Sequence, residues 1–562
     1  MKTYLTYFKN DYFIKPALFL ITVLALITYQ YRQLANQTST NAPRLAVVIV
    51  IDQFAYHYLP RLRPYFKAGL KKLFNEGVLY HNCVYPHGLP CTATGHAALS
   101  SGAYGKDHGI ISNQWVNENG SIINAGFDDA ETSYVFAPNG STYDYGVSAN
   151  AMLVDNFSDQ FLLAEQPGTK HFCAAFSFKD RAAALMAGKK GSAFWFDAKG
   201  GQMTSSRAYF DALPEWLTLF NQTHKLSEDT IIHWESTFPA NSPAYNFSMS
   251  QDYTFTTYGK QFMGTSFPAG KTFNNFKMSP DCDKLTLETA KEYLKHTACP
   301  NSTTMLWISL SALDFCGHMF GPNTVESADI LYHIDQCLLE FMNYVETLAP
   351  ATNITWALTA DHGVMPIPEV LNAKGFAQAQ RIDSKEHLKA MNELVYSQFG
   401  IKNLIKLYQT PQFYFDKPLF RSLPYEAQQA ITAMLTDYLK AIPGIVDVWS
   451  MEELLSNIPH WSEFTQLFQN QTQKDRSGEL TCLFSPYTLL TEYDKGTSHA
   501  TPYLYDRHVP MVIHQQDLTT NKNISAPTSP LQLVRTLAYL LGVQAPSASV
   551  RDPLPEIFDP LS

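Results

Sequence analysis

A continuous run of β-branched residues constrains the fold of this chain more than any other feature. The run RLAVVIVI occupies residues 44–51, and Asp52 follows it directly. An apolar run without alternation is typical of a strand that is buried on both faces, as strands are in parallel sheets. The segments 303–314, 354–363 and 509–515 show the same pattern. The sequence therefore predicts a mostly parallel sheet that includes these four strands.

Helical patterns lie between the predicted strands, for example at 65–77, 327–348 and 529–542. Strands that alternate with helices indicate an α/β fold in which helices cover both faces of the sheet. The segment 370–475 differs, because it has mixed short elements, aromatic residues and an amphipathic helix in YEAQQAITAMLTDYLKAI. We interpret 370–475 as a cap or insert, and 44–369 with 476–562 as the catalytic core.

Composition excludes several classes of protein. Hydrophobic residues make up 45% of the chain, which supplies a packed core and excludes a disordered protein. The 41 basic and 51 acidic residues give a net charge of −10, and no dense block of Lys and Arg occurs. A nucleic-acid binder of the usual electrostatic kind is therefore excluded.

The first 43 residues have the pattern of an export signal. Lys2, Lys9 and Lys15 precede sixteen uncharged residues, PALFLITVLALITYQY. A positive flank before a short apolar run indicates a secretory signal peptide or an uncleaved signal anchor; the alternative is a buried core helix. The sequence thus predicts export, with a periplasmic or membrane-anchored protein whose N-terminal segment contacts the membrane.

The cysteines suit an oxidising compartment only weakly. The chain has eight cysteines and no C-x-x-C pair, which excludes a zinc knuckle and a thioredoxin-like motif. If two of them form a disulfide, Cys282 and Cys299 are the nearest plausible pair. The sequence does not set the oligomeric state.

Acidic residues end three of the four predicted strands. These residues are Asp52, Asp314 and Asp361. In open α/β sheets, ligands bind beyond the carboxyl ends of the strands. One such Asp alone would more often be a helix cap, but three at the same edge indicate a functional site.

Histidines accompany these carboxylates. His318 lies four residues after Asp314, His362 follows Asp361 directly, and His499 precedes the strand at 509–515. Carboxylate oxygens and neutral imidazoles are the ligands that zinc and related divalent ions prefer at hydrolytic sites. Each cluster alone is more typical of polar residues at the surface or of a helix cap. Together with Asp52, they supply six ligands, enough for two sites of three ligands each.

Thr92 is the candidate nucleophile. It lies in PHGLPCTATGHAALSSG, where a turn with Gly and Pro leads into a helical pattern. A hydroxyl at the start of a helix lies where backbone N–H groups also bind phosphate oxygens. The alternative is that Thr92 only caps the helix.

A series of motifs resembles one enzyme superfamily in order and spacing. The motifs are IDQF, CTATGH, HGIISNQW, FSFKDRAAALMAG, LDFCGHMFGP, TADHG and TSHATPYLYDRHVP, and they extend over roughly residues 44 to 545. They resemble the alkaline phosphatase superfamily, and within it the exported bacterial phosphomonoesterases of PafA type, which use a Thr nucleophile. These are related to the type I phosphodiesterase/nucleotide pyrophosphatase group.

The resemblance implies a site with two zinc ions per chain and an α/β core of the alkaline phosphatase type. Asp314, His318 and His499 resemble the ligands of one zinc. Asp52, Asp361 and His362 resemble those of the other, to which the nucleophile Thr92 also binds. Asn113 resembles the residue that hydrogen-bonds a phosphoryl oxygen, and Lys179 and Arg181 resemble the paired cations of the monoesterase branch. The implied activity is zinc-dependent hydrolysis of phosphate monoesters, small phosphorylated metabolites, through a phosphothreonine.

The sequence also bears on activities related to this one. A sulfatase needs C-x-P/A-x-R, and the residues from Cys91 to Gly95 lack that Arg. Neither the Ser nucleophile nor the third metal of the serine-type alkaline phosphatases is evident. A phosphodiesterase or nucleotide pyrophosphatase shares the metal ligands, the Thr and the Asn, and is the main alternative. A catalytically inactive surface-binding ectodomain is disfavoured, because the nucleophile and all six ligands are present.

Overall fold

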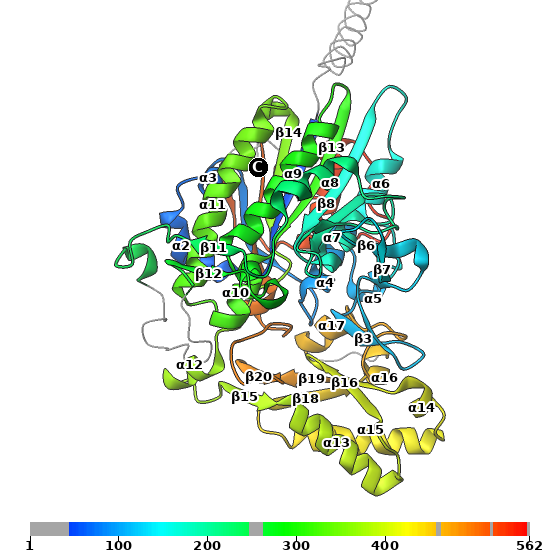
Figure 1. Cartoon of the computed structure of the whole chain (residues 1–562). Helices are drawn as coiled ribbons and strands as arrows, with labels where there is room; N and C mark the ends of the chain where they lie inside the picture. The colour runs from blue at the N-terminus through cyan, green and yellow to red at the C-terminus, as the bar shows by residue number, and fades with distance from the viewer. Residues whose placement is uncertain (1–43, 247–261, 457–461, 518–520, 559–562) are drawn as a thin grey trace, which may run out of the picture.

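The computed structural model describes residues 44–246, 262–456, 462–517 and 521–558 (Figure 1). The predicted export segment, 1–43, lies outside these residues. Among the helices of the described residues, none is both long enough and apolar enough to cross a membrane.

The core is one large sheet. Nine strands of the described residues pair in the order β10-β9-β8-β13-β1-β14-β21-β2-β22. Their bounds are β10 Gln202–Thr204, β9 Ser192–Asp197, β8 Lys170–Ser177, β13 Ser302–Leu310, β1 Arg44–Ile51, β14 Ile354–Thr359, β21 His508–Gln515, β2 Val78–Val84 and β22 Lys522–Ile524. Neighbouring pairs are parallel except at β10 and β21. The predicted α/β class with a mostly parallel sheet is confirmed.

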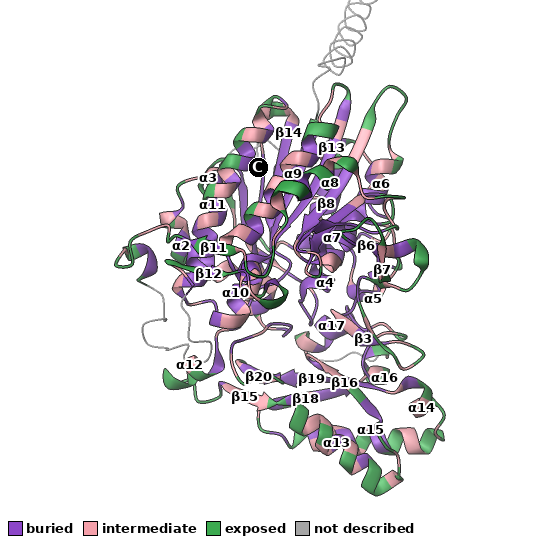
Figure 2. Cartoon of the chain, viewed as in Figure 1, coloured by how far each residue is buried: buried purple, intermediate pink, exposed green. Residues whose placement is uncertain are grey.

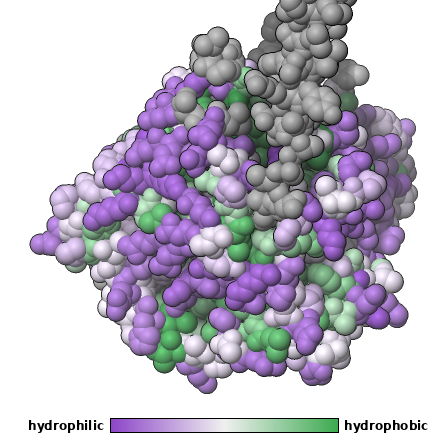
Figure 3. Space-filling model, turned by 90° about the horizontal axis from the view of Figure 1, so that it is seen from above, coloured by the Kyte–Doolittle hydropathy of each residue, from purple (hydrophilic) through white to green (hydrophobic). Residues whose placement is uncertain are grey.

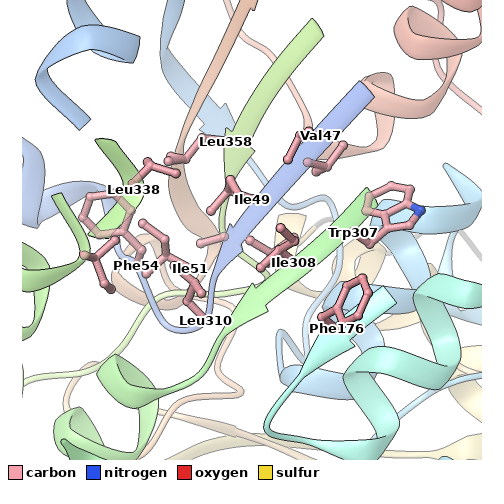
Figure 4. Close-up of a cluster of buried hydrophobic side chains, with 14 of the residues drawn as sticks. Val47, Ile49, Ile51, Phe54, Phe176, Trp307, Ile308, Leu310, Leu338 and Leu358 are labelled. Carbon is pink, nitrogen blue, oxygen red and sulfur yellow. The ribbon is translucent and has the colours of Figure 1, made fainter. Parts of the chain in front are cut away.

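Strand β1 occupies the middle of the sheet, as its apolar run predicts. It pairs in parallel with β13 on one side and β14 on the other. Every residue from Leu45 to Ile51 is fully buried. In Figure 4, Val47, Ile49 and Ile51 of β1 lie among side chains from both neighbouring strands, including Ile308 and Leu358. Because β1, β13 and β14 are adjacent and parallel, the residues that follow them meet at one edge of the sheet.

The direction of one of the four predicted strands differs from that of the other three. Strand β21, which contains the apolar run 509–515, is antiparallel to both β14 and β2. Val509, Met511, Val512 and Ile513 are fully buried, and Pro510 is buried between them. An unbroken apolar run indicates burial on both faces but does not specify the direction in which the strand runs.

Helices cover both faces of the sheet (Figure 1). One layer contains α3 (Gly69–Glu76), α9 (Pro280–Thr297) and α11 (Val325–Glu346), which pack on one another. Another contains α4 (Thr92–Ser101), α7 (Asp180–Ala187) and α19 (Leu533–Leu541). Figure 2 shows the strands buried and the exposed residues on the outer sides of the helices. The face seen from above, around the amino ends of the strands, is largely hydrophilic with small separate apolar patches (Figure 3).

A second, smaller unit faces the carboxyl ends of the core strands (Figure 1). Its four-stranded sheet has the order β16 (Ile405–Gln409), β17 (Gln412–Phe415), β19 (Leu480–Phe484) and β18 (Ile445–Ser450). Helices α13 (Ser384–Phe399) and α15 (Tyr425–Lys440) pack on it around a separate apolar cluster. A two-stranded sheet joins β15 (Gln380–Asp383) to β20 (Thr488–Thr491). Since β19 and β20 follow residue 475, we propose that the insert extends from about residue 370 to residue 491.

All eight cysteines lie within the described residues, and each is a free thiol. The disulfide considered between Cys282 and Cys299 is therefore not formed. Cys282 lies in the first turn of α9, and Cys299 follows the end of that helix. At 1.5 Å of rise per residue the helix separates them by about 25 Å, far beyond the reach of a disulfide.

Candidate active site

The start of helix α4 singles out Thr92 over its neighbour Thr94. Cys91 caps the helix, and Thr94 forms the capping box with it. The Thr94 hydroxyl accepts a hydrogen bond from the Cys91 N–H at 3.1 Å and lies 2.9 Å from the carbonyl oxygen of Leu89. Among the described residues, by contrast, the Thr92 hydroxyl makes one hydrogen bond, which it accepts from Lys179 Nζ at 3.2 Å. Thr92 is thus the first residue of the helix, and its oxygen is available for chemistry.

The three strand-end aspartates come together at the edge where β1, β13 and β14 end. Asp52 and Asp361 are fully buried, and Asp314 is 3% exposed. Asp314 lies in the first turn of α10 (Ala312–Phe320), directly after β13. Three carboxylates buried this closely need positive charge nearby, because burial and mutual repulsion both disfavour their ionised forms.

Three histidines are oriented in the same way, with Nε2 toward these carboxylates and Nδ1 toward a backbone carbonyl. The Nδ1 atoms of His318, His362 and His499 lie 2.8, 2.9 and 3.0 Å from backbone carbonyl oxygens. Those oxygens belong to Thr497, Gly363 and Pro90. In a neutral imidazole, an Nδ1–H that donates to a carbonyl leaves Nε2 unprotonated and fixes the ring orientation, which is how metal-ligating histidines are held.

The donor atoms form two overlapping groups. In one, atoms of Asp314, His318 and His499 lie within 4.8 Å of one another. In the other, the same limit holds for atoms of Asp52, Asp314 and His362. Asp361 adjoins the second group, since its Oδ2 is 3.4 Å from His362 Nε2. The seven residues predicted as metal ligands therefore include six that the structure brings into one cluster, with Thr92 beside it.

The cluster fits divalent cations. Asp52 Oδ1, Asp361 Oδ2 and His362 Nε2 are buried and make no hydrogen bond. Buried polar atoms without a partner are costly, so such atoms are expected to bind something else. Carboxylate oxygens and imidazole nitrogens are the donor set of hydrolytic zinc sites.

The ammonium of Lys179 lies inside the same cluster. Its Nζ is 2.5 Å from Asp52 Oδ2 and 2.5 Å from Asp314 Oδ2. Burial disfavours the charged lysine, but Asp314 and Asp52 outweigh it and raise the pKa of Lys179. Likewise, burial disfavours the charged form of His362, but Asp361 and Asp52 outweigh it and raise its pKa to about 10. Cations that bind these atoms must compete with these charges, so binding releases protons.

Asn113 and Arg181 lie on another side of Thr92. The Asn113 side-chain oxygen accepts a hydrogen bond from the Ala93 N–H at 2.9 Å, which ties it to the start of α4. Arg181 Nε donates to the same oxygen at 3.3 Å. The Asn113 amide nitrogen is left as a donor. The four residues predicted to contact phosphate, Thr92 included, thus surround the start of one helix.

Two residues of the site were missed by the sequence argument. His96 is fully buried, with Nδ1 2.8 Å from the carbonyl oxygen of Thr92 and Nε2 2.9 Å from the hydroxyl of Ser309. Its position four residues after Thr92 in CTATGH was a signal, since residues i and i+4 share a helix face. Gln53 has a φ of 69° and donates from Nε2 to Asp314 Oδ1 at 2.8 Å. A positive φ strains the backbone at a non-glycine residue. No pattern of side chains in the sequence indicates where such strain occurs.

Known proteins resemble the chain over most of its length. It is 27% identical over 540 residues to "Alkaline phosphatase PafA" of Elizabethkingia meningoseptica, covering 92% of this chain and 95% of that protein. It is also 27% identical over 534 residues to a Myroides odoratus protein named "Calcium-transporting ATPase", with the same coverage. The crystal structure of wild-type PafA matches the fold with a TM-score of 0.75 at 24% identity, covering 93% of this chain and 100% of that one.

The family profile described as type I phosphodiesterase / nucleotide pyrophosphatase matches residues 46–510. This span runs from β1 to β21 and includes every residue of the cluster described above. The resemblance drawn from the sequence motifs is confirmed. The chain belongs to the type I phosphodiesterase/nucleotide pyrophosphatase family.

Proposed function

We propose that this protein is a phosphate monoester hydrolase that binds two zinc ions and forms a phosphothreonine on Thr92. The observation that carries the proposal is the Thr92 hydroxyl, placed at the first turn of α4 and next to a buried cluster of carboxylates and histidines. The similarity to a protein named alkaline phosphatase supports it.

Asp314, His318 and His499, which form the first group of donor atoms, would hold one ion. Asp52 and His362 of the second group, together with the adjoining Asp361, would hold the other. When bound, the ions supply positive charge to the attacking and the leaving oxygen of the reaction.

The residues of the chain position the phosphoryl group. Thr92 Oγ1 attacks phosphorus, the bond from phosphorus to the alcohol oxygen breaks, and the phosphoryl group is transferred to the threonine. The Asn113 amide and the Arg181 guanidinium donate to non-bridging oxygens, where transition-state charge is spread. Water then cleaves the phosphothreonine, which releases inorganic phosphate and restores the hydroxyl.

Preference for monoesters follows from the number of cations. A monoester presents three non-bridging oxygens and a diester presents two, with one charge fewer. Lys179 and Arg181, with Asn113, supply three donors, so the third oxygen of a monoester gains a partner. The terminal phosphoryl group of ATP also has three such oxygens, so the activity named for the Myroides relative involves the same kind of group.

Phosphodiester hydrolysis is the second candidate, because the family description names phosphodiesterases and nucleotide pyrophosphatases. It shares Thr92, Asn113 and the metal ligands with the first candidate. A monoesterase needs a hydrogen-bond donor for the third non-bridging oxygen of its substrate, and a diesterase does not. Arg181 is the residue to test as that donor.

For the compartment, we propose export directed by residues 1–43, which lie outside the described residues.

The test is to trap the intermediate. Zinc-loaded protein is mixed with phenyl phosphate, quenched in acid during turnover and digested for peptide mass analysis. We expect phosphate on Thr92, none in Thr92→Ala, and partial turnover in Thr92→Ser, which keeps the hydroxyl. Both variants should retain zinc, because six other ligands remain. Turnover with phosphate on Thr94, or with no phosphorylated peptide, would overturn the proposal.

A further inference from the structure

A cavity of about 1210 Å³ lies between the core and the insert. On the core side it is lined by Phe315 and His318 of α10 and by Gly496–Ser498, and on the insert side by residues of β16 and β20. In Figure 1 these strands lie below α10. The volume exceeds what one phosphoryl group fills, since drug-sized ligands occupy pockets of about 300–1,000 Å³.

The lining of this cavity is strongly basic, although the chain as a whole is acidic. Five lining residues are cationic at neutral pH and one is anionic; they are Lys277, Arg381, Lys385, Lys406 and Lys495, and Glu492. The net charge of the chain is −10. A concave surface lined by one sign of charge concentrates the opposite sign.

Partners account for three of these cations. Arg381 pairs with Glu369 at 2.7 Å, Lys385 with Glu492 at 3.2 Å, and Lys406 with Asp416 at 3.2 Å. Within the described part of the chain, Lys277 and Lys495 have no carboxylate within ion-pairing distance.

Lys277 is held close to the catalytic cluster. Its Nζ lies 4.8 Å from the ring centroid of Phe315, the residue after Asp314, and Lys179 Nζ lies 5.0 Å from the same centroid. Burial and repulsion by Lys179 lower the pKa of Lys277, although Asp314 raises it. Lys277 is thus a partly buried cation between the metal cluster and the cavity, and the proposed reaction does not use it.

The position of His318 relates the cavity to the substrate. His318 belongs to the metal cluster and also lines the cavity, as do Thr497 and Ser498, which precede His499. When the phosphoryl group of a substrate lies at Thr92, the alcohol part of that substrate extends into this cavity. Building on the proposed function, we propose that the cavity is a subsite for the leaving group and that Lys277 and Lys495 bind a second anionic group on it. The substrate class is phosphate monoesters whose alcohol carries a further phosphate or carboxylate.

The test compares substrates with alcohols of similar reactivity and different charge. The probes are butyl phosphate, butane-1,4-diol bisphosphate and 4-(phosphonooxy)butanoate, each with the zinc-loaded full chain. We expect kcat/KM for the bisphosphate and for 4-(phosphonooxy)butanoate to exceed that for butyl phosphate by about tenfold or more. The value for the bisphosphate is first divided by two, because either of its two equivalent phosphoryl groups can react. The preference should shrink as salt rises, because the cavity is open to solvent.

Variants then assign the preference to the two lysines. The double variant Lys277→Met/Lys495→Gln should lower the ratio of kcat/KM values by about tenfold, and Met keeps the apolar contact with Phe315. Lys385→Gln is the matched control, because it lines the same cavity but is paired with Glu492; its ratio should stay within about twofold of the wild type. The use of a ratio removes any general loss of activity from the comparison.

The outcomes separate this inference from the proposed function. Equal kcat/KM values for the three probes, or a preference that the double variant retains, would overturn the subsite while leaving the hydrolase standing. A preference only for the bisphosphate would restrict the subsite to phosphate. Failure to hydrolyse any of the three probes would instead contradict the proposed function itself.

Discussion

At the scale of single residues, the orientation of two of the three histidines depends on a backbone carbonyl from a distant part of the chain. Pro90, just before the nucleophile, holds His499, and Thr497 holds His318. The rings of His362 and His499 also stack, with centroids 3.7 Å apart. The cluster of carboxylates and histidines and the start of α4 are therefore parts of one network, and a change in either should affect the other.

His499→Ala tests the proposed ligand set. The variant removes one of three proposed protein ligands from the first group, so we expect bound zinc to fall from two ions to about one per chain. Loss of a residue that only supports a ligand already lowers metal affinity or activity by about 10- to 100-fold, so we expect activity to fall by at least about 100-fold. Metal analysis after dialysis measures this. His224→Ala, on the half-exposed end of α8 (Glu215–His224), is the control and should keep both ions. Full zinc content in the His499 variant would show that this histidine is not a ligand.

The site residues were predictable to different degrees. The coming together of Asp52, Asp314, Asp361 and their histidines was predictable, because a polar residue next to the end of a buried strand leaves a pattern in the sequence. Gln53 was not, since its role depends on a φ of 69° and on the approach of α10. Close approach is a property of the assembled fold, which a single residue type does not encode.

At the scale of secondary-structure elements, α4 crosses over the loop after β14 at Gly95. A Cβ at Gly95 would lie 2.3 Å from the carbonyl oxygen of Asp361 and 2.7 Å from its Cβ. These atoms belong to the backbone and to a buried ligand, so they cannot move aside freely. Gly95→Ala should lower the free energy of unfolding by about 1–3 kcal/mol and reduce activity through displacement of Thr92. Chemical denaturation and kcat measure the two effects; an unchanged variant would contradict the close packing.

Strand β19 of the insert gives a pH-dependent prediction. Glu479, just before β19, is buried, and its Oε2 accepts the Phe415 N–H at 2.7 Å. Burial raises its pKa from 4.5 to about 7, although the hydrogen bond and Lys417 lower it. The folded insert therefore favours the protonated acid, so this contribution to stability is complete below pH 4.5 and is lost as pH rises to about 7.

Glu479→Gln removes the charge and keeps the accepting oxygen. We expect the variant to be more stable than the wild type at pH 8, by up to about 3 kcal/mol, and to lack the decline between pH 4.5 and 7. Denaturation followed by the fluorescence of Trp449 in β18 reports on this unit. The exposed Glu426→Gln in α15 is the control. A variant with the same pH dependence as the wild type would show that Glu479 does not titrate in this range.

The predictability of the elements follows from what a pattern contains. The runs at β1, β13 and β14 predicted buried neighbouring strands, and the patterns at 327–348 and in YEAQQAITAMLTDYLKAI predicted helices that the structure has as α11 and α15. The direction of β21 was not predictable, because direction depends on the chain path before the strand. In this case that path first runs through the insert and the loop of His499.

At the scale of the whole molecule, two units face each other across the site. The core supplies Thr92 and the cluster of carboxylates and histidines, and the insert covers the open side and contributes part of a basic cavity. The strand order places β1 between β13 and β14, so the carboxylates of residues 52, 314 and 361 converge although they are far apart in the sequence. On the proposed function, the chemistry belongs to the core, and we propose that selection of the leaving group belongs to the boundary between the units.

One comparison tests the central claim directly. The values of kcat/KM for phenyl phosphate and for its methyl diester are measured with the same zinc-loaded protein. Charge-assisted hydrogen bonds contribute about 1.5–3 kcal/mol each, so the two cations Lys179 and Arg181 together should favour the monoester by about two to four orders of magnitude. Arg181→Lys should narrow the gap, because Lys does not bind two oxygens at once. A wild-type protein that hydrolyses the diester as fast as the monoester, or faster, would contradict the account and identify a phosphodiesterase.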